Sequence, residues 1–239
     1  MEPQNKSTPE APRNTLNSLI LPGIGTFVIG AVVLGVVLCL LAGTFRYWQG
    51  WAFAVLFSAL TNGQGIYLGL KDPELLERRK NIAPADESTA QRIFLVVALL
   101  ADVCLMLFAA VDRRFGWSPA PALVSVVGDA LLVFSFFIYY LVFRENSFAA
   151  SSIKTFEGQK VISTGPYARV RHPKYVGDLV LVIGIPLALG SWWALAFVLL
   201  TMPGLVWRIL DEEKLLKKDL PGYDEYTRKV RFRLVPYLW

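Results

Sequence analysis

The stretch LILPGIGTFVIGAVVLGVVLCLLA, residues 19–42, decides the fold class of this 239-residue chain. It carries no charge, and a helix of this length reaches about 36 Å, enough to cross the roughly 30 Å hydrocarbon core of a bilayer. It is longer than the apolar core of a signal peptide, and no small-residue cleavage pattern follows it, so we expect a helix that stays in the membrane. Residues 1–18 are polar and contain three prolines, which predicts a mobile tail.

Four further apolar regions follow along the chain. They cover residues 48–70, 93–111, about 120–143, and 175–210. The last region is broken at Gly190-Ser191 into two arms, and its first arm, residues 175–189, would reach only about 22 Å. This arm belongs either to a tilted hairpin in a thinned bilayer or to a re-entrant hairpin. The sequence therefore predicts an all-α integral membrane protein with five to six transmembrane helices, the last of which form a C-terminal helical hairpin.

Composition supports this fold class and excludes others. Hydrophobic residues make up 54% of the chain and charged residues 18%, below the roughly 25% of soluble domains. Mean hydropathy is +0.46. The two cysteines, Cys39 and Cys104, both fall in apolar runs, which excludes a disulfide scaffold.

Most of the basic residues gather in four segments. Of the 24 lysines and arginines, 21 lie in residues 1–18, 71–92, 144–174 and 208–239, which the predicted helices place on one side of the membrane. Cytoplasmic segments retain positive charge, so this distribution predicts that both termini are cytoplasmic. It also explains the net charge of +5, which in a soluble protein would suggest nucleic acid. We therefore expect no nucleic-acid partner.

The segment GPYARVRHPKY, residues 165–175, combines an ordered loop with the start of a helix. Pro173 disfavours helical geometry at His172 and suits the first turn of the helix that follows. Arg171 and His172 would thus stand at a helix N-terminus, which favours an anion such as a carboxylate or a phosphate. A positively charged membrane anchor with a turn explains the same residues. Because His172 is the only histidine and both cysteines are in apolar runs, we expect no metal site.

A second charged cluster, RILDEE at residues 208–213, lies at the end of the hairpin's second arm. Arg208 and Glu212 are four residues apart and share one helix face. They form either an interfacial salt bridge, which contributes little when exposed, or a partly buried pair that grips a polar substrate group. The basic and aromatic end that follows, residues 220–239, is typical of a surface that binds membrane lipid headgroups.

Several polar residues fall within the predicted spans, where polar groups are costly. Asp102 lies in the middle of the third span, and Asn62 and Gln64 lie in the second. We interpret them as partners in hydrogen bonds between helices, with close helix approach at Gly63 and Gly65. A role in lining a substrate site is the alternative.

The C-terminal part of the chain resembles the isoprenylcysteine carboxyl methyltransferase family, which is related to the membrane phospholipid methyltransferases. The resemblance rests on GPYARVRHPKY, the short hairpin and RILDEE, and continues through PGYDEY at 221–226 and RFRLVP at 231–236. It covers roughly residues 145–239. PGYDEY departs from the form typical of eukaryotic members and is closer to bacterial-type members, whose substrates the resemblance does not settle.

This resemblance implies an S-adenosylmethionine-dependent methyltransferase without a Rossmann domain, with its cofactor at the cytosolic end of the C-terminal helices. By analogy, the cofactor-binding residues are Tyr167, Val170, Arg171, His172, Pro173, Tyr175 and Glu213, and the catalytic residues are Arg208 and Glu212. The implied acceptor is a lipophilic molecule that enters from the bilayer of a bacterial inner membrane. The reference acceptor in the family is a carboxylate on an isoprenylcysteine-like thioether.

The catalytic pair supports two kinds of methyl transfer. A carboxylate acceptor is already ionised, and Arg208 would hold it bidentately while Glu212 orients Arg208. An amine acceptor, as in phospholipid N-methylation, needs a general base, for which Glu212 is the candidate. A sterol-reductase-type enzyme that uses NADPH and a non-catalytic membrane protein are further alternatives. On the methyltransferase hypothesis the chain comprises a tail (1–18), four transmembrane helices (19–143) and a catalytic region (144–239).

Overall fold

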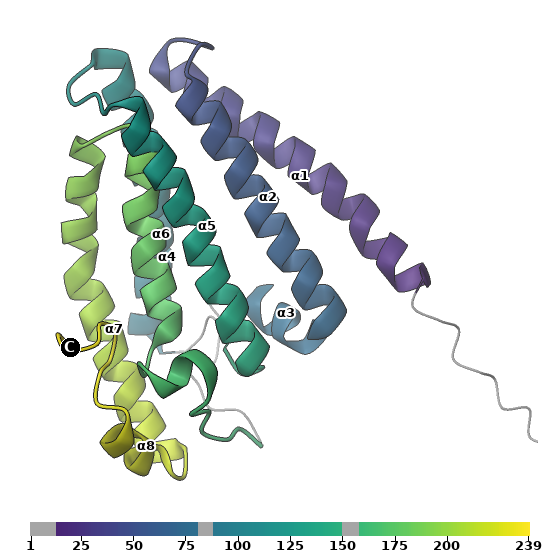
Figure 1. The fold of residues 1–239 in the computed structure, drawn as a ribbon, viewed down its shortest axis with the longest axis vertical. Helices are drawn as coiled ribbons and strands as arrows, with labels where there is room; N and C mark the ends of the chain where they lie inside the picture. The colour runs from purple at the N-terminus through teal and green to yellow at the C-terminus, as the bar shows by residue number, and fades with distance from the viewer. Residues whose placement is uncertain (1–12, 81–87, 150–157) are drawn as a thin grey trace, which may run out of the picture.

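The protein is a bundle of helices in the part of the chain that the structure, a computed structural model, describes: residues 13–80, 88–149 and 158–239. The α-helices are α1 (Arg13–Ala42), α2 (Trp48–Lys71), α3 (Pro73–Lys80), α4 (Thr89–Phe115), α5 (Ala122–Glu145), α6 (Pro173–Ala188), α7 (Ala196–Asp219) and α8 (Tyr223–Lys229). Two 3₁₀ turns, η1 (Gly165–Ala168) and η2 (Trp193–Leu195), precede α6 and α7. Figure 1 shows the long helices side by side, with α1 inclined along α2 at one edge of the bundle.

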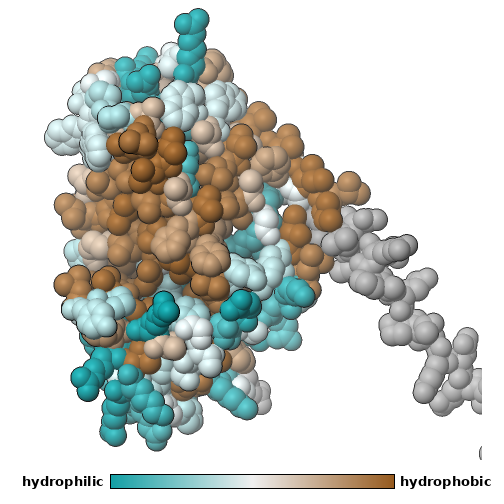
Figure 2. Space-filling model, in the orientation of Figure 1, coloured by the Kyte–Doolittle hydropathy of each residue, from teal (hydrophilic) through white to brown (hydrophobic). Residues whose placement is uncertain are grey.

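Among the described residues, five helical segments are long and apolar enough to cross a membrane, which confirms the predicted fold class. They are Ile20–Ala42, Trp48–Lys71, Thr89–Phe115, Ala122–Glu145 and Trp193–Asp219. Large apolar side chains cover their outward surfaces, as at Leu199 and Leu200, which are 74% and 75% exposed. Figure 2 shows the resulting apolar band between hydrophilic ends. Such a surface is costly in water and suits lipid.

The segments rich in lysine and arginine gather at one end of the bundle. This end, which we call the basic face, carries α3, η1 and α8 (Figure 1). The opposite face carries the turns that join α1 to α2, α4 to α5, and α6 to α7. Exposed tryptophans on the opposite face include Trp117, Trp192 and Trp193.

The turn of the C-terminal hairpin is bound to the other turns of the opposite face. The Tyr47 hydroxyl, before α2, donates to the Leu189 carbonyl at 2.6 Å. The buried Asp112 carboxylate of α4 accepts hydrogen bonds from the hydroxyls of Ser118 and Ser191. The 16-residue α6, about 24 Å long, therefore reaches the same face as the longer helices, and the hairpin extends to that face instead of turning back inside the bundle.

The first helix begins earlier than the sequence suggested. We expected a tail over residues 1–18, but α1 begins at Arg13, so residues 13–18 are helical; residues 1–12 lie outside the described residues. Extending an existing helix by a turn costs little, because the unfavourable nucleation step has already been made by the apolar run.

The polar residues of the spans behave in different ways. Asn62 does join two helices, since the Thr26 hydroxyl of α1 donates to its Oδ1 at 2.5 Å. The close helix approach expected at Gly63 and Gly65 is wrong: a Cβ atom added at either glycine would meet nothing within 4 Å. Asp102 is half-buried in α4 and makes no hydrogen bond to another described residue, so the interhelical explanation holds only for Asn62.

The close approach of helices occurs instead between α5 and α6. A Cβ atom added at Gly128 would lie 2.0 Å from the Ala188 nitrogen and 2.5 Å from the Leu187 carbonyl carbon. These are backbone atoms and cannot turn aside as a side chain can. Gly128 therefore sets how closely α6, which begins at the candidate site, lies against α5.

We predict that Gly128→Ala destabilises the protein by about 1–3 kcal/mol or more, because the added methyl group overpacks two backbones. The matched control is Gly63→Ala in α2, where the same methyl group meets nothing within 4 Å. This control should leave stability unchanged or raise it by about 0.5–1 kcal/mol through helix propensity. Thermal unfolding of both variants in one detergent measures the difference, and equal melting temperatures would contradict the packing argument.

Candidate functional site

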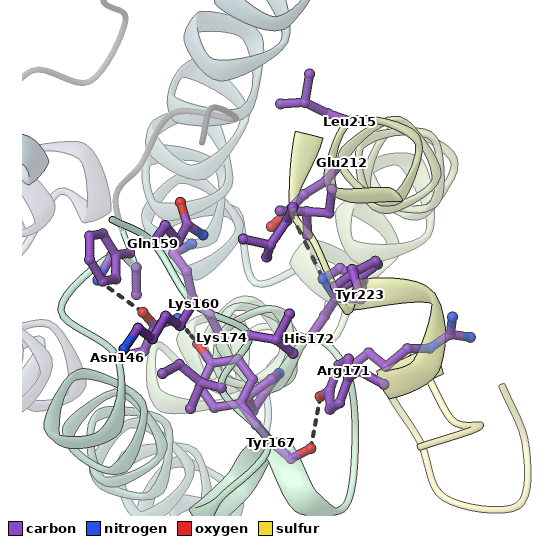
Figure 3. Close-up of a pocket in the computed structure, with 18 of the residues that line it drawn as sticks. Asn146, Gln159, Lys160, Tyr167, Arg171, His172, Lys174, Glu212, Leu215 and Tyr223 are labelled. Carbon is purple, nitrogen blue, oxygen red and sulfur yellow. Dashed lines mark hydrogen bonds and ion pairs between the residues drawn. The ribbon is translucent and has the colours of Figure 1, made fainter. Parts of the chain in front are cut away.

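Many polar side chains surround one hollow at the basic face, where α6 begins. Five parts of the chain form its wall: the segment after α5, the loop before α6, the first turn of α6, the second half of α7, and α8. The hollow encloses about 900 Å³ of space free of protein atoms, counted out to its open mouth. Figure 3 shows side chains from these parts converging on it, among them Tyr167, His172, Glu212 and Tyr223.

The loop before α6 is held in shape from both sides. Gly165 has a φ of +57°, and an added Cβ atom there would lie 2.7 Å from Cγ of Glu145. Both facts explain the glycine at the start of the motif. On the other side, the amides of Arg171 and His172 donate to the carbonyls of Phe232 and Arg233 at 2.9 and 3.0 Å. The C-terminal segment therefore fixes the backbone that delivers the two basic residues.

Helix α6 begins as the sequence predicted. His172 is the N-cap residue and Pro173 occupies the first helical position. The His172 side chain makes no capping hydrogen bond, and Pro173, Lys174 and Tyr175 line the pocket. The positive end of the helix dipole thus faces the hollow, which favours an anionic ligand group.

Behind the wall lies a buried charge cluster centred on Glu213. Its carboxylate contacts Nη1 of Arg171 at 2.9 Å and Nε2 of His172 at 3.3 Å through one oxygen, and Nε of Arg233 at 3.0 Å through the other. The side chains of Glu213, Arg171 and His172 are 5%, 7% and 4% exposed. Burial of a carboxylate is tolerated when its charge and lone pairs are compensated in this way.

A second polar network surrounds Arg208, which is 3% exposed. Its Nε donates to the Tyr175 hydroxyl at 3.0 Å, and that hydroxyl donates to Glu212 at 2.7 Å. Arg208 and Glu212, expected as a pair on one helix face, are thus joined through Tyr175 of α6. The Nη1 atom of Arg208 donates to Gln91 of α4 at 2.7 Å, and Gln91 in turn donates to Asp211.

Three tyrosines complete the wall, and all three are neutral donors. Burial raises the pKa of Tyr167, Tyr223 and Tyr226 above the ordinary tyrosine value, so their hydroxyls stay protonated at neutral pH. The Tyr226 hydroxyl donates to the Tyr167 carbonyl at 2.8 Å, and the amide of Asn146 donates to the Tyr167 hydroxyl at 2.9 Å.

Two buried polar groups on this wall have no protein partner among the described residues. They are Nε of Arg171 and the hydroxyl of Tyr223. A buried donor without a partner costs about 1–3 kcal/mol, which is unfavourable unless a ligand or water accepts its hydrogen bond. The two groups therefore mark where a ligand with acceptor oxygens or nitrogens fits.

The structure brings most of the residues chosen from the sequence into one wall. Those that line the hollow are Tyr167, Arg171, His172, Pro173, Tyr175, Arg208 and Glu212. Glu213 lies behind Arg171 and His172, and Val170 is buried beside Tyr226, whose hydroxyl lies 3.5 Å from the Val170 carbonyl. These two residues support the wall instead of forming it. Their binding roles, like those of the lining residues, remain predictions.

Sequence reasoning missed two participants in the site. Gln91, 2% exposed, connects Arg208 with Asp211 from a different helix. Its only signal in the sequence is a polar residue at the start of an apolar run. Tyr223 lies within PGYDEY, but nothing in the sequence shows that its hydroxyl is buried.

Comparison with known proteins agrees with the geometry. Residues 123–221 match the family model of the phospholipid methyltransferases, a family that includes membrane methyltransferases like the isoprenylcysteine carboxyl methyltransferases. The matched segment contains α5, the α6–α7 hairpin and the RILDEE cluster. The match confirms the resemblance seen in the motifs for this part of the chain.

Two curated relatives match shorter segments. A Delta(14)-sterol reductase of Mus musculus is 32% identical over 91 residues, which are 37% of this chain and 22% of the reductase. A nickel-cobalt-cadmium resistance protein of Alcaligenes xylosoxydans xylosoxydans is 35% identical over 75 residues, which are 29% of this chain and 33% of that protein. The chain therefore spans less than two thirds of the length of either relative.

We predict that Glu213→Gln costs about 3 kcal/mol or more of stability, because it leaves the buried Arg171 and the partly buried Arg233 without a compensating charge. The matched control is the adjacent Glu212→Gln. The Glu212 side chain is 26% exposed; among the described residues it accepts a hydrogen bond from Tyr175 and lies 4.0 Å from Nδ1 of His172, so this change should cost about 1 kcal/mol. Melting temperatures in detergent compare the two, and a smaller loss for Glu213→Gln would show that the cluster does not hold the loop.

Proposed function

We propose that the protein is an S-adenosylmethionine-dependent membrane methyltransferase that methylates a lipophilic acceptor arriving from the bilayer. The acceptor group that we propose is a carboxylate on an isoprenylcysteine-like molecule, in the inner membrane of a bacterium, with the basic face and both termini in the cytoplasm. One observation carries the proposal. The segment matched by the phospholipid methyltransferase family forms most of a pocket at the start of a helix, and this segment carries the buried Nε of Arg171, which has no partner among the described residues.

The residues of this pocket fit S-adenosylmethionine. Its carboxylate suits Arg171, whose buried Nε lacks a partner, and the N-terminal amides of α6. The Tyr223 hydroxyl can donate to a ring nitrogen or a ribose oxygen, and the faces of Tyr167 and Tyr226 offer surfaces for the adenine. When bound, the cofactor supplies an electrophilic methyl group on a positively charged sulfur. Glu212 and the ring of Tyr175 are the groups on the wall that would attract that charge.

For a carboxylate acceptor, the protein has to orient a nucleophile that is already ionised. Arg208 lies on the wall beside Glu212 and provides the positive charge. Its Nε and Nη1 already donate to Tyr175 and Gln91, which holds the guanidinium in one orientation. We therefore propose that Arg208 acts as a charge fixed in position by Tyr175 and Gln91.

Amine methylation is the second candidate, since the matched family is described as acting on phospholipids. A protonated lipid amine must lose a proton before it attacks, and Glu212 is the carboxylate on the wall that can accept it. A reductase that uses NADPH is the third, because a sterol reductase is among the relatives. Cofactor binding separates the reductase from the two methyltransferases.

We predict that the purified protein binds S-adenosylmethionine and S-adenosylhomocysteine in isothermal titration calorimetry and does not bind NADPH. Tyr223→Phe should weaken S-adenosylhomocysteine binding by about 2- to 10-fold, the loss of one hydrogen bond, without lowering the melting temperature, because the hydroxyl has no protein partner among the described residues. Tyr226→Phe provides the contrast, since it removes a bond to the Tyr167 carbonyl and should lower stability by about 1 kcal/mol. Folded protein that binds neither sulfur compound would overturn the methyltransferase proposal.

Turnover with two acceptors separates the carboxylate and amine mechanisms. With a radiolabelled methyl donor and an isoprenylcysteine-like carboxylate, Arg208→Ala should lower turnover by about 100-fold or more, while S-adenosylhomocysteine still binds. Glu212→Gln should lower turnover with this acceptor less than Arg208→Ala does, because it weakens the attraction for the positive sulfur but no proton has to be removed. If Glu212→Gln abolishes transfer to a lipid amine that the wild type methylates, the amine mechanism is correct. Loss of S-adenosylhomocysteine binding in Arg208→Ala would place Arg208 in the cofactor site.

A further inference from the structure

A second hollow lies apart from the candidate site, in a groove between α2, α3, α5 and α6. It encloses about 850 Å³ of space free of protein atoms, counted out to its open side. The residues of its wall used below are Phe57 and Gln64 of α2, Phe136 of α5, Leu181 of α6, and Arg79 and Lys80 of α3. Figure 2 shows a recess with hydrophilic residues between the apolar surfaces of α5 and α2, within the apolar band.

The groove changes in polarity along the membrane normal. Its end at the basic face is formed by α3 and carries Arg79 and Lys80. Gln64 lies seven residues before Lys71, the end of α2, which is about 10 Å deeper in the bundle. Phe57 lies seven residues further from that end, about another 10 Å along the helix. From the basic face inward, the groove is therefore cationic, then polar, then apolar, which is the order in which a phospholipid presents its phosphate, its ester groups and its acyl chains.

Arg79 is fixed in place at the cationic end. Its guanidinium lies over the Phe143 ring, 4.4 Å from the ring centroid, and its Nη1 donates to the Ala149 carbonyl at 3.1 Å. These contacts among the described residues use one of its five N–H donors. Asp178, the carboxylate in the groove, does not oppose an anion here, because it accepts from Tyr139 at 2.6 Å and pairs with Lys174 at 2.8 Å.

Gln64 is the polar residue that lies between the cationic end and the apolar end of the groove. Its Nε2 is buried and has no partner among the described residues. An amide donor without an acceptor is unfavourable within the apolar layer, where no water replaces the missing bond. A carbonyl oxygen from outside the protein would satisfy it, and ester carbonyls are the acceptors that a lipid carries at this depth.

We propose that this groove binds an anionic phospholipid of the leaflet at the basic face, as a bound lipid and not as the methyl acceptor. Arg79 and Lys80 hold the phosphate and the anionic headgroup, Gln64 donates to an ester carbonyl, and one acyl chain lies against Phe57, Phe136 and Leu181. The groove is separated from the candidate site by the first turns of α6, whose Lys174 lines the site while Asp178 lines the groove. The proposal stands independently of the methyl-transfer chemistry.

Native mass spectrometry of the full chain in a mild detergent tests the proposal, with phosphatidylglycerol and phosphatidylcholine of identical acyl chains titrated separately. The wild type should retain phosphatidylglycerol at concentrations about tenfold lower than phosphatidylcholine, a difference that corresponds to about 1.4 kcal/mol. Arg79→Gln should remove this preference. Gln64→Leu should weaken the retention of both lipids, since an ester carbonyl is common to them.

The matched control is Arg78→Gln, which removes the same charge from the neighbouring residue of α3. Arg78 pairs with Glu74 and donates to the Ser147 carbonyl, and it does not line the groove, so its replacement should keep the preference. Equal retention of the two lipids by the wild type, or an equal loss in Arg78→Gln and Arg79→Gln, would overturn the proposal. Melting temperatures recorded without added lipid identify any variant that is unfolded. If Arg79→Gln is unfolded, Arg79→Lys, which keeps the positive charge, is used in its place. Under the proposal it keeps the preference, and losing it would count against a phosphate site.

Discussion

The buried carboxylate of Glu213 is the interaction on which the candidate site depends. It ties three parts of the chain together: α7, which carries it; the loop before α6, through Arg171 and His172; and the C-terminal segment, through Arg233. None of these charges is stable in a buried place alone, so each part is held by the others. The loop backbone is bound to the same C-terminal segment at Phe232 and Arg233. The geometry of the pocket wall thus follows from one compensated charge behind it.

The fold was predictable from the sequence because a bilayer imposes simple conditions. A helix that crosses the apolar layer needs a long run without charge, and retained positive charge identifies the side on which the connecting segments lie. The structure begins α2 at Trp48 and α5 at Ala122, at or within two residues of the predicted starts, and breaks the hairpin around Gly190. The motif around His172 was predictable for a similar reason, since the capping rules for a proline-led helix are local.

What the sequence did not reveal are contacts between residues far apart in the chain. Gln91 lies 117 residues from its partner Arg208, and no periodicity or motif connects the two. Gly63 and Gly65 were expected to allow a close helix contact, but the contact is made by Gly128, because which glycine faces a neighbour depends on how whole helices pack. The location of Glu213 behind the wall has the same origin. Its neighbour Glu212 points to the pocket, and a rotation of about 100° per residue separates them.

Tyr175 lies between Arg208 and Glu212 and contacts both of them. Spacing alone makes the two charged residues neighbours on one helix face, and a direct salt bridge would satisfy each with the other. The Tyr175 hydroxyl of α6 accepts from Arg208 and donates to Glu212, so it connects the two charged residues, and both of them line the pocket. A positive and a negative group on one wall suit the two groups of the proposed reaction, an anionic acceptor and a methyl donor with a positive sulfur. Tyr175 belongs to α6, whereas Arg208 and Glu212 belong to α7. The position of Tyr175 between them therefore depends on how α6 packs against α5 and on the hydrogen bonds that hold the turn between α6 and α7.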